Sequence, residues 1–371
     1  MVNMTQLFLA SDGAPQTSNA IAKLILAMYH WIGNFGWMVV VFTIFLKLIL
    51  LPLDLWQKHT MTKNNRAMKI ITPELEKLKK SYANAPDVLQ RKQMELYKKS
   101  GYSMTGGCLP ALVTIVIFFV VFAGFNAAVK CQNERIVYYM AERYNAEAEL
   151  YDQKVASNPD ITAEEISEMK AELERTMVAV YNEKKQSWLW VDNVFMADTF
   201  INPVPSQERF TGSGLGYINA KLPYNLPTRL TYTNAYGGYD AVIAPAKNEY
   251  NRRYFFDMKH WNGYFILPFL SIFLSIFSMK ITKGMQPEMP AKTDENGNPL
   301  PNQAGMMKAM NWLMPIMMGV FALFYSTAFC IYMFTNSLIT VVFNLVYNYF
   351  AKKQDAKEED KRLSETFKRS R

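Results

Sequence analysis

Forty-three consecutive residues near the C-terminus, 309–351, contain no Asp, Glu, Lys, Arg or His. As one α-helix this run would be about 64 Å long, which is twice the ~30 Å hydrocarbon core of a bilayer. Residues 100–129 and 261–279 form two further uncharged runs. The average composition hides these runs, because 19% of all residues are charged. The pattern predicts an all-α membrane protein that crosses the bilayer several times.

A fourth apolar run, 36–57, carries one lysine near its middle. As a helix it would be about 33 Å long, so Lys47 would lie near the centre of the bilayer. An ammonium group there costs about 2.5–3.5 kcal/mol on insertion scales and usually faces a protein interior or a water-filled cavity. We favour a charge in a water-filled groove. Snorkelling is disfavoured because either interface is roughly seven or more residues away, and a buried ion pair is the remaining alternative.

The positions of Lys and Arg predict how the chain is oriented. Residues 1–35 carry one Lys, whereas residues 58–105 carry eleven Lys or Arg. The positive-inside rule then places the N-terminus outside and the C-terminus in the cytoplasm. The net charge of +8 predicts attraction to anionic lipid, and we do not expect DNA binding. The five predicted transmembrane helices are 36–57, 109–129, 262–279, 311–328 and 330–350.

A basic helical hairpin is predicted on the cytoplasmic side, over residues 58–105. Thr72 followed by Pro73 suits the start of its first helix. Asp87 suits a capping box at the start of the second helix, and Gly101 marks the end of that helix. The hairpin is either an anchor on the lipid surface or a moving contact surface for a substrate or another machine.

Residues 1–35 form the predicted outer N-terminal segment. Ile21, Leu24, Ile25 and Met28 recur at helical spacing, which predicts a helix. This helix lies either at the outer membrane interface or against the spans of its own chain. The segment lacks a basic region followed by a small-residue cleavage site, so we expect no cleaved signal peptide.

The connection 131–259 is predicted to be a mixed extracellular insertion. Its first part is rich in Ala, Glu and Lys and should form a helical hairpin that is broken near Asn158 and Pro159. Its second part holds Pro- and Gly-rich strings, which predict turns and irregular or short-strand structure. The remaining predicted segments are a cytoplasmic loop, 280–308, and a charged cytoplasmic tail, 351–371.

Several strings resemble successive motifs of the YidC/Oxa membrane-protein insertase family, and they occur in family order. The strings are Asn34–Gly36, Phe42–Gln57, Ile71–Tyr82, Gly101–Pro110, Ser187–Thr199 and Met310–Leu338. The resemblance implies five core helices around a hydrophilic groove that is open to the cytoplasm and to lipid and closed outside. It also implies a positive charge in that groove and a place in the plasma membrane. The chain is similar to the simpler five-span type of Gram-positive bacteria, because no large exported domain precedes the first span.

The resemblance assigns the groove charge to Lys47, where family members usually carry Arg. Lysine keeps the charge but lacks the planar fork of donors, so either the groove stays wet or Lys47 has a partner. A second departure is Thr114, in a part of the second span where relatives often have Gln and Pro. The implied partners are nascent membrane proteins and lipid, with the ribosome and the general secretory translocon as further candidates.

Polar side chains in the other spans support a polar interior. Asn336, Thr340, Asn344 and Asn348 form a stripe at four-residue spacing, which is unusual for a surface facing lipid. The alternative for these residues is interhelical hydrogen bonding, worth about 0.6–2 kcal/mol per contact. The predicted polar lining of the groove comprises Thr43, Thr114, Ser271, Ser275, Tyr325, Asn336, Thr340 and Asn344.

The sequence predicts a function that needs no cofactor, metal or covalent step. There is no phosphate-binding loop, and His30, His59 and His260 are too scattered to suggest a metal cluster. We therefore expect an insertase or chaperone for nascent membrane proteins rather than an enzyme. Two other classes stay open: a transporter or channel that uses the mid-membrane lysine, and a membrane scaffold whose outer insertion is the working part.

Overall fold

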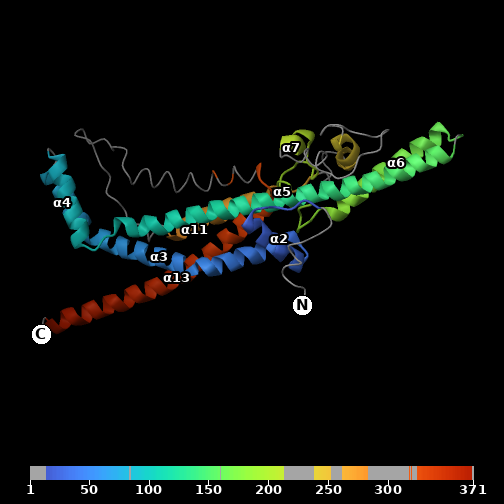
Figure 1. Cartoon of the computed structure of the whole chain (residues 1–371). Coiled ribbons are helices and arrows are strands. Elements are labelled where there is room, and N and C mark those ends of the chain that lie inside the picture. Colours follow the sequence, from blue (N-terminus) through green and yellow to red (C-terminus); the bar gives the residue numbers. More distant parts are fainter. Residues whose placement is uncertain are drawn as a thin grey trace. The chain divides into compact units, whose positions relative to one another are not determined.

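The computed structural model describes residues 14–82, 85–158, 160–212, 238–251, 261–282, 317, 319 and 324–369. Regular structure in these ranges is helical, apart from one isolated antiparallel bridge between Trp188 and Val191 (Figure 1). The elements are α2 (Ala20–Ile32), α3 (Phe35–Ser81), α4 (Pro86–Lys99), α5 (Met104–Ser157), α6 (Ala163–Lys184), α7 (Gln207–Gly212), the π-helix η2 (Tyr239–Ile243), α10 (Ala244–Asn251), α11 (Ile266–Thr282) and α13 (Thr327–Arg369).

Three helices in the described part of the chain are long and apolar enough to cross a membrane: α3, α5 from Leu112, and α13 as far as Gln354. Helices α2 and α11 are also apolar but shorter. The prediction of an all-α membrane protein is confirmed. Most of the predicted span 311–328 lies outside the described residues, so the number of five spans stays a prediction.

Helix α3 continues without a break through the predicted start at Thr72 and Pro73, so that prediction is wrong. The hydroxyl of Thr72 does not cap a new helix but donates to the carbonyl of Met68 at 2.7 Å. Pro73, which lies inside the helix, is tolerated because this part of α3 contributes to a buried apolar cluster. Its buried cluster is Met68, Ile71 and Leu75, against which Leu96, Tyr97 and Tyr102 pack.

The second helix of the hairpin, α4, begins at Pro86, and its N-cap residue Ala85 makes no side-chain capping bond. The predicted capping box at Asp87 is therefore wrong. The predicted stop is confirmed, because Gly101 has a left-handed φ of 70° just after α4. The chain then returns to α3, where the side chain of Asn64 exchanges two hydrogen bonds of 2.8 and 3.0 Å with the backbone of Ser103.

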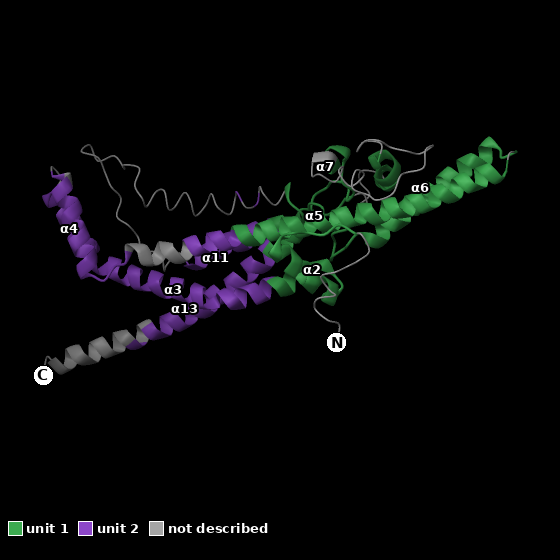
Figure 2. Cartoon of the chain, viewed as in Figure 1, with its two compact units in different colours: residues 1–42, 119–268, 320–332 green, residues 43–118, 269–319, 333–371 purple. Residues whose placement is uncertain are grey.

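The chain divides into two compact units, coloured separately in Figure 2. Unit 1 comprises residues 1–42, 119–268 and 320–332. Unit 2 comprises residues 43–118, 269–319 and 333–371. Several long helices contribute a segment to each unit, and α3 changes units at Phe42.

In unit 1, α5 and α6 lie side by side as a helical hairpin (Figure 1). Helix α5 ends at Ser157, which confirms the predicted break near Asn158 and Pro159. Helix α6 then starts with a capping box between Thr162 and Glu165. The hydrogen bonds from Thr162 stabilise the carboxylate and lower the pKa of Glu165. The hairpin is thus specified locally, by a breaker followed by a strong helix start.

The second part of the insertion differs from its prediction in two places, at the short helix α7 (Gln207–Gly212) and at residues 239–251. Residues 187–206 are turns and irregular backbone, as the Pro-rich composition predicts. Residues 239–251, for which turns or short strands were expected, are helical instead. Tyr239 and Tyr250 are buried there, so tertiary packing overrides the local preference. Most of the remaining Gly- and Pro-rich strings fall in 213–237, outside the described residues.

Helix α2 packs one face within unit 1. The Asn19 side chain caps its start, and Gly33 ends it with a φ of 81°. Ile21 lies against Gly124 of α5, where an added Cβ would come within 2.4 Å of the isoleucine side chain. The opposite side is open, since Trp31 is 88% exposed. The helix therefore packs on its own chain with one face and leaves the other available for the membrane interface.

Gly36 at the start of α3 is a second close approach in unit 1. A Cβ built on it would lie 2.3 Å from Cγ of Trp188, whose ring packs edge-on against Trp37. We expect Gly36→Ala to lower the free energy of unfolding by about 1–3 kcal/mol, because the indole would have to move. Unfolding of the detergent-solubilised chain, followed by tryptophan fluorescence, would measure this. A variant as stable as the parent would contradict the contact.

Candidate functional site

Lys47 lines a small pocket of about 140 Å³ inside unit 2. Helix α3 supplies one wall, and α13 supplies the other. Apart from Lys47, Asp54 and Thr340, the lining residues are apolar. A volume of this size is enough for several water molecules or the ends of two polar side chains. The lining residues are Ile44, Lys47, Leu48, Leu51, Asp54, Ile339, Thr340 and Phe343.

The ammonium group of Lys47 is paired with a carboxylate of its own helix. Lys47 Nζ lies 3.1 Å from Oδ2 of Asp54, and the two side chains are 20% and 18% exposed. They are seven positions apart, which is about two helical turns, so both project from the same face of α3. The site is therefore a partly buried ion pair with access to the pocket.

Sequence reasoning missed the role of Asp54, although it predicted that Lys47 stays hydrated or has a partner. The signal was available in the spacing, because residues seven apart on a helix share a face. It was overlooked because helical ion pairs are normally sought at three- or four-residue spacing. At seven residues the lysine has to extend along the helix to reach the carboxylate, and its long side chain permits this.

Two predicted lining residues lie on α13 at or beside the pocket. Thr340 lines it, and its hydroxyl donates to the carbonyl of Asn336 at 2.7 Å. Because that donor is occupied, the hydroxyl oxygen can offer only its acceptor side to a group in the pocket. Asn336 itself is half-buried one turn earlier on the same helix.

Other predicted lining residues lie in a hydrogen-bonded seam between α11 and α13. Ser275 pairs with Ser337 at 3.1 Å, and the amide of Asn344 donates to Ser278 at 2.8 Å. One turn further, the amide of Asn348 donates to the carbonyl of Ile281 at 3.0 Å. Interhelical hydrogen bonding, the alternative considered for the stripe, thus accounts for the contacts of Ser275 and Asn344.

The four remaining predicted lining residues are not among those that line the Lys47 pocket. Thr43 and Ser271 are buried in unit 2, on α3 and α11, and Thr114 is half-buried on α5. Tyr325 belongs to unit 1, where its ring packs edge-on against Phe122 and Phe329. The structure therefore brings together Lys47 and Thr340, with Asn336 beside them.

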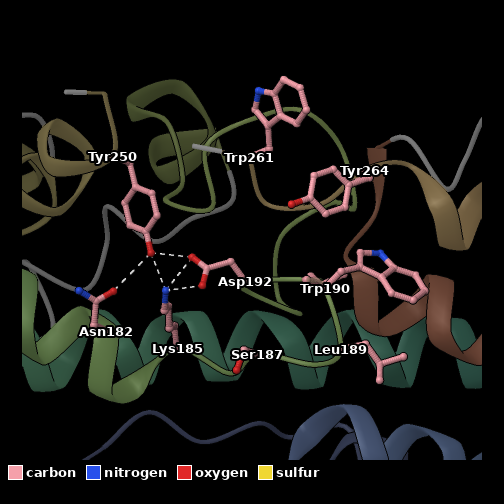
Figure 3. A pocket seen from close by; sticks show the side chains of 10 residues that line it. Asn182, Lys185, Ser187, Leu189, Trp190, Asp192, Tyr250, Trp261 and Tyr264 are labelled. Atoms are coloured by element: carbon pink, nitrogen blue, oxygen red, sulfur yellow. Dashed lines mark hydrogen bonds and ion pairs between the residues drawn. The ribbon is translucent and has the colours of Figure 1, made fainter. Parts of the chain in front are cut away.

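Unit 1 holds a second and larger pocket, of about 570 Å³ (Figure 3). Lys185 contacts both carboxylate oxygens of Asp192 at 2.6 Å, and the hydroxyl of Tyr250 lies within hydrogen-bonding distance of both residues. Figure 3 shows this polar cluster together with aromatic side chains, Trp190 and Tyr264 among them. The cluster ties α6 and α10 to the loop that follows α6.

That loop, Ser187–Thr199, holds the N-termini of two helices in unit 1. The carboxylate of Asp198 accepts hydrogen bonds from the backbone N–H groups of Tyr264, Phe265 and Leu267, at 2.9 to 3.2 Å, where α11 begins. At the start of α13, Thr327 donates through N–H and hydroxyl to the carbonyl of Met196. The loop thus satisfies donors that both helices leave unpaired at their starts.

Asp198 is fully buried, which disfavours its charged form. Burial raises the pKa of Asp198 above its ordinary value, although the three backbone donors act in the opposite direction. The role of this carboxylate is structural, since its oxygens are aimed at the first turn of α11. In the described part of the chain, no group of three or more His, Cys, Asp or Glu could hold a metal ion.

A comparison of the sequence with known protein families identifies the family of this chain. The model of the 60Kd inner membrane protein family matches residues 27–355, which include both pockets and all of the loop that holds α11 and α13. The chain belongs to this family. The resemblance to membrane-protein insertases drawn from the sequence strings is thereby confirmed.

Individual relatives match a shorter stretch. A membrane protein insertase YidC of Fusobacterium nucleatum is 40% identical over 109 residues, which are 29% of this chain and 51% of that protein. One of Caldanaerobacter subterraneus is 36% identical over 102 residues, 28% of this chain and 48% of that protein. One of Leptospira interrogans is 34% identical over 116 residues, 31% of this chain and 18% of that protein. The chain therefore matches about half or less of the length of these relatives.

Proposed function

We propose that this member of the 60Kd inner membrane protein family is a membrane-protein insertase that uses the Lys47 pocket. The observation that carries the proposal is a cation on a membrane-length helix, held at 20% exposure beside a pocket rather than packed into a dry seam. The names of its relatives support the same function. The polar lining predicted around Lys47 belongs to this proposal, with Thr340 and Asn336 nearest to the charge.

The physical task is to move a short polar tail of a client across the bilayer. The barrier is the cost of removing water from backbone and side-chain polar groups. A hydrated pocket within the membrane removes part of that cost, and Lys47 attracts client carboxylates where the dielectric constant is low. The apolar segment of the client, about 20 residues, enters lipid and supplies the driving force. No covalent step is required.

The proposed setting is the plasma membrane, with the N-terminus outside and the C-terminus in the cytoplasm. The clients are nascent membrane proteins, and lipid is the second partner. The basic hairpin and the tail would face the cytoplasm, where they could attract ribosomal RNA in a contact that weakens steeply with salt. A contact with the general secretory translocon belongs to the same proposal.

The test uses cells in which this chain replaces the depleted resident insertase. The client is a single-span protein with one Asp in a short N-terminal tail, and exposure of that tail to external protease measures insertion. We expect Lys47→Ala to lower insertion about tenfold, equivalent to about 1.4 kcal/mol, and Lys47→Arg to retain most of it. Lys130→Ala, which removes an exposed lysine of α5 outside the basic hairpin and the pocket, is the matched control.

The outcomes separate the three function classes. If the chain restores no client insertion, it is not an insertase. If insertion is restored but is the same in the parent chain, in Lys47→Ala and in Lys47→Arg, the charge site is wrong and a scaffold is favoured. A transporter would show altered solute flux with client insertion intact. The double variant Lys47→Ala with Asp54→Asn shows whether the effect comes from the lost cation or from the carboxylate left behind.

A further inference from the structure

Lys47 is already neutralised by a carboxylate that the chain itself provides. Asp54 Oδ2 lies 3.1 Å from the ammonium nitrogen, so it already accepts a hydrogen bond from the group that a client carboxylate would bind. Both groups line the same pocket and are exposed to a similar, small extent. A client acid that enters the pocket therefore meets an ion pair rather than a free cation.

We propose that Asp54 is a specificity-determining residue, which makes the pocket favour client segments that carry an acid and a base together over segments that carry an acid alone. This inference rests on the proposed insertase function and concerns the charge pattern of the clients. It assigns Asp54 two roles. Asp54 competes with client acids for Lys47, and it receives client bases when Lys47 is taken.

A count of the ion pairs supports this selectivity. A lone client acid that binds Lys47 brings a second carboxylate to the one ammonium group that lines the pocket, beside Asp54 at 18% exposure. An excess negative charge at a partly buried site is costly, and salt screens it less than it screens a surface charge. A segment with one acid and one base exchanges partners instead: its acid binds Lys47 and its base binds Asp54, so two pairs replace one.

The remaining lining residues of the pocket cannot compensate for an excess negative charge. Five of them are apolar, namely Ile44, Leu48, Leu51, Ile339 and Phe343. They offer no hydrogen bonds from their side chains to an unpaired carboxylate. Thr340 offers an acceptor oxygen, because its hydroxyl hydrogen is directed to the carbonyl of Asn336. That oxygen suits an ammonium or guanidinium group of a client and does not help a client acid.

The experiment uses three clients that differ only at two neighbouring tail positions: Asp with Lys, Asp with Gln, and Asn with Gln. Insertion is measured by protease exposure in the full chain, in Asp54→Asn and in the control Glu76→Gln, which neutralises an exposed acid of the same helix. The ratio of insertion of the Asp-Lys client to that of the Asp-Gln client should fall about tenfold in Asp54→Asn, as expected for a difference of about 1.4 kcal/mol. Glu76→Gln should leave this ratio unchanged.

A charge-swapped variant, Lys47→Asp with Asp54→Lys, tests the same idea if Asp54→Asn does not accumulate. It keeps one ion pair on the same face of α3, so it should again prefer the Asp-Lys client, whereas Lys47→Asp alone should not. An unchanged ratio in Asp54→Asn, or a swapped variant that prefers the Asp-Gln client, would overturn the proposal. In either case, a loss of insertion in Lys47→Ala would show that the insertase function itself stands.

Discussion

Replacing Lys47 with glutamate is expected to reduce insertion of an acid-tailed client about 100-fold, roughly twice the free-energy effect of alanine. The new carboxylate and that of Asp54 would project from one face of α3, into a pocket whose other walls are mostly apolar. Two like charges at such a site repel each other and repel the client carboxylate, and the low dielectric constant strengthens both effects. The same protease-exposure assay measures the result.

Lys47→Gln is the control for this prediction, because it has nearly the size of glutamate and no charge. If glutamate and glutamine reduce insertion equally, the sign of the charge is irrelevant and the electrostatic mechanism is wrong. A client with a basic tail gives the complementary test. Its insertion should fall less with glutamate than with glutamine, since a carboxylate at position 47 attracts it.

Asp198→Ala is expected to lower the free energy of unfolding of unit 1 by about 3–5 kcal/mol. The change removes the acceptors of three backbone N–H groups at the start of α11, and each buried donor left unpaired costs about 1–3 kcal/mol. It also removes a negative group from a helix N-terminus. Hydrogen exchange of the detergent-solubilised chain is the most direct measurement, because the amides of Tyr264, Phe265 and Leu267 should lose their protection.

Two variants check the cause of this loss. Asp240→Ala removes an exposed acid from unit 1 and should change neither stability nor exchange. Gly263→Ala should resemble Asp198→Ala, because a Cβ at position 263 would lie 1.9 Å from Oδ1 of Asp198 and displace the carboxylate. Unchanged protection of the α11 amides in Asp198→Ala would show that α11 does not depend on this cap.

The sequence predicted those parts of the fold that are decided locally or by hydrophobicity. Where the structure describes them, the long uncharged runs correspond to apolar helices, and α5 ends at Ser157, shortly before the capping box of Thr162. The prediction failed where tertiary packing decides. Thr72 and Pro73 have the residue types of a helix start, yet the cluster around Met68 keeps α3 continuous. A local signal cannot show that an interior proline is outweighed by packing elsewhere.

The sequence predicted the charge of the candidate site, Lys47, but its ion pair with Asp54 was missed. Lys47 stood out because a lysine within an apolar run is costly. Asp54 did not stand out, since it lies near the end of the same run, where a span would be expected to end. The polar residues of the spans were recognised as a group, but the sequence could not divide them between a pocket and a seam. That division depends on which helix faces which, and only the contacts of Thr340 and Asn344 reveal it.

The loop that holds α11 and α13 precedes both helices in the chain. During translation from the N-terminus, Val194, Met196 and Asp198 are therefore made before either helix that they anchor. The acceptors for the first turns of both helices therefore precede their donors in the order of synthesis. A protein proposed to guide others into the bilayer would then contain, in this loop, the acceptors that fix the N-termini of two of its own helices as soon as each is made.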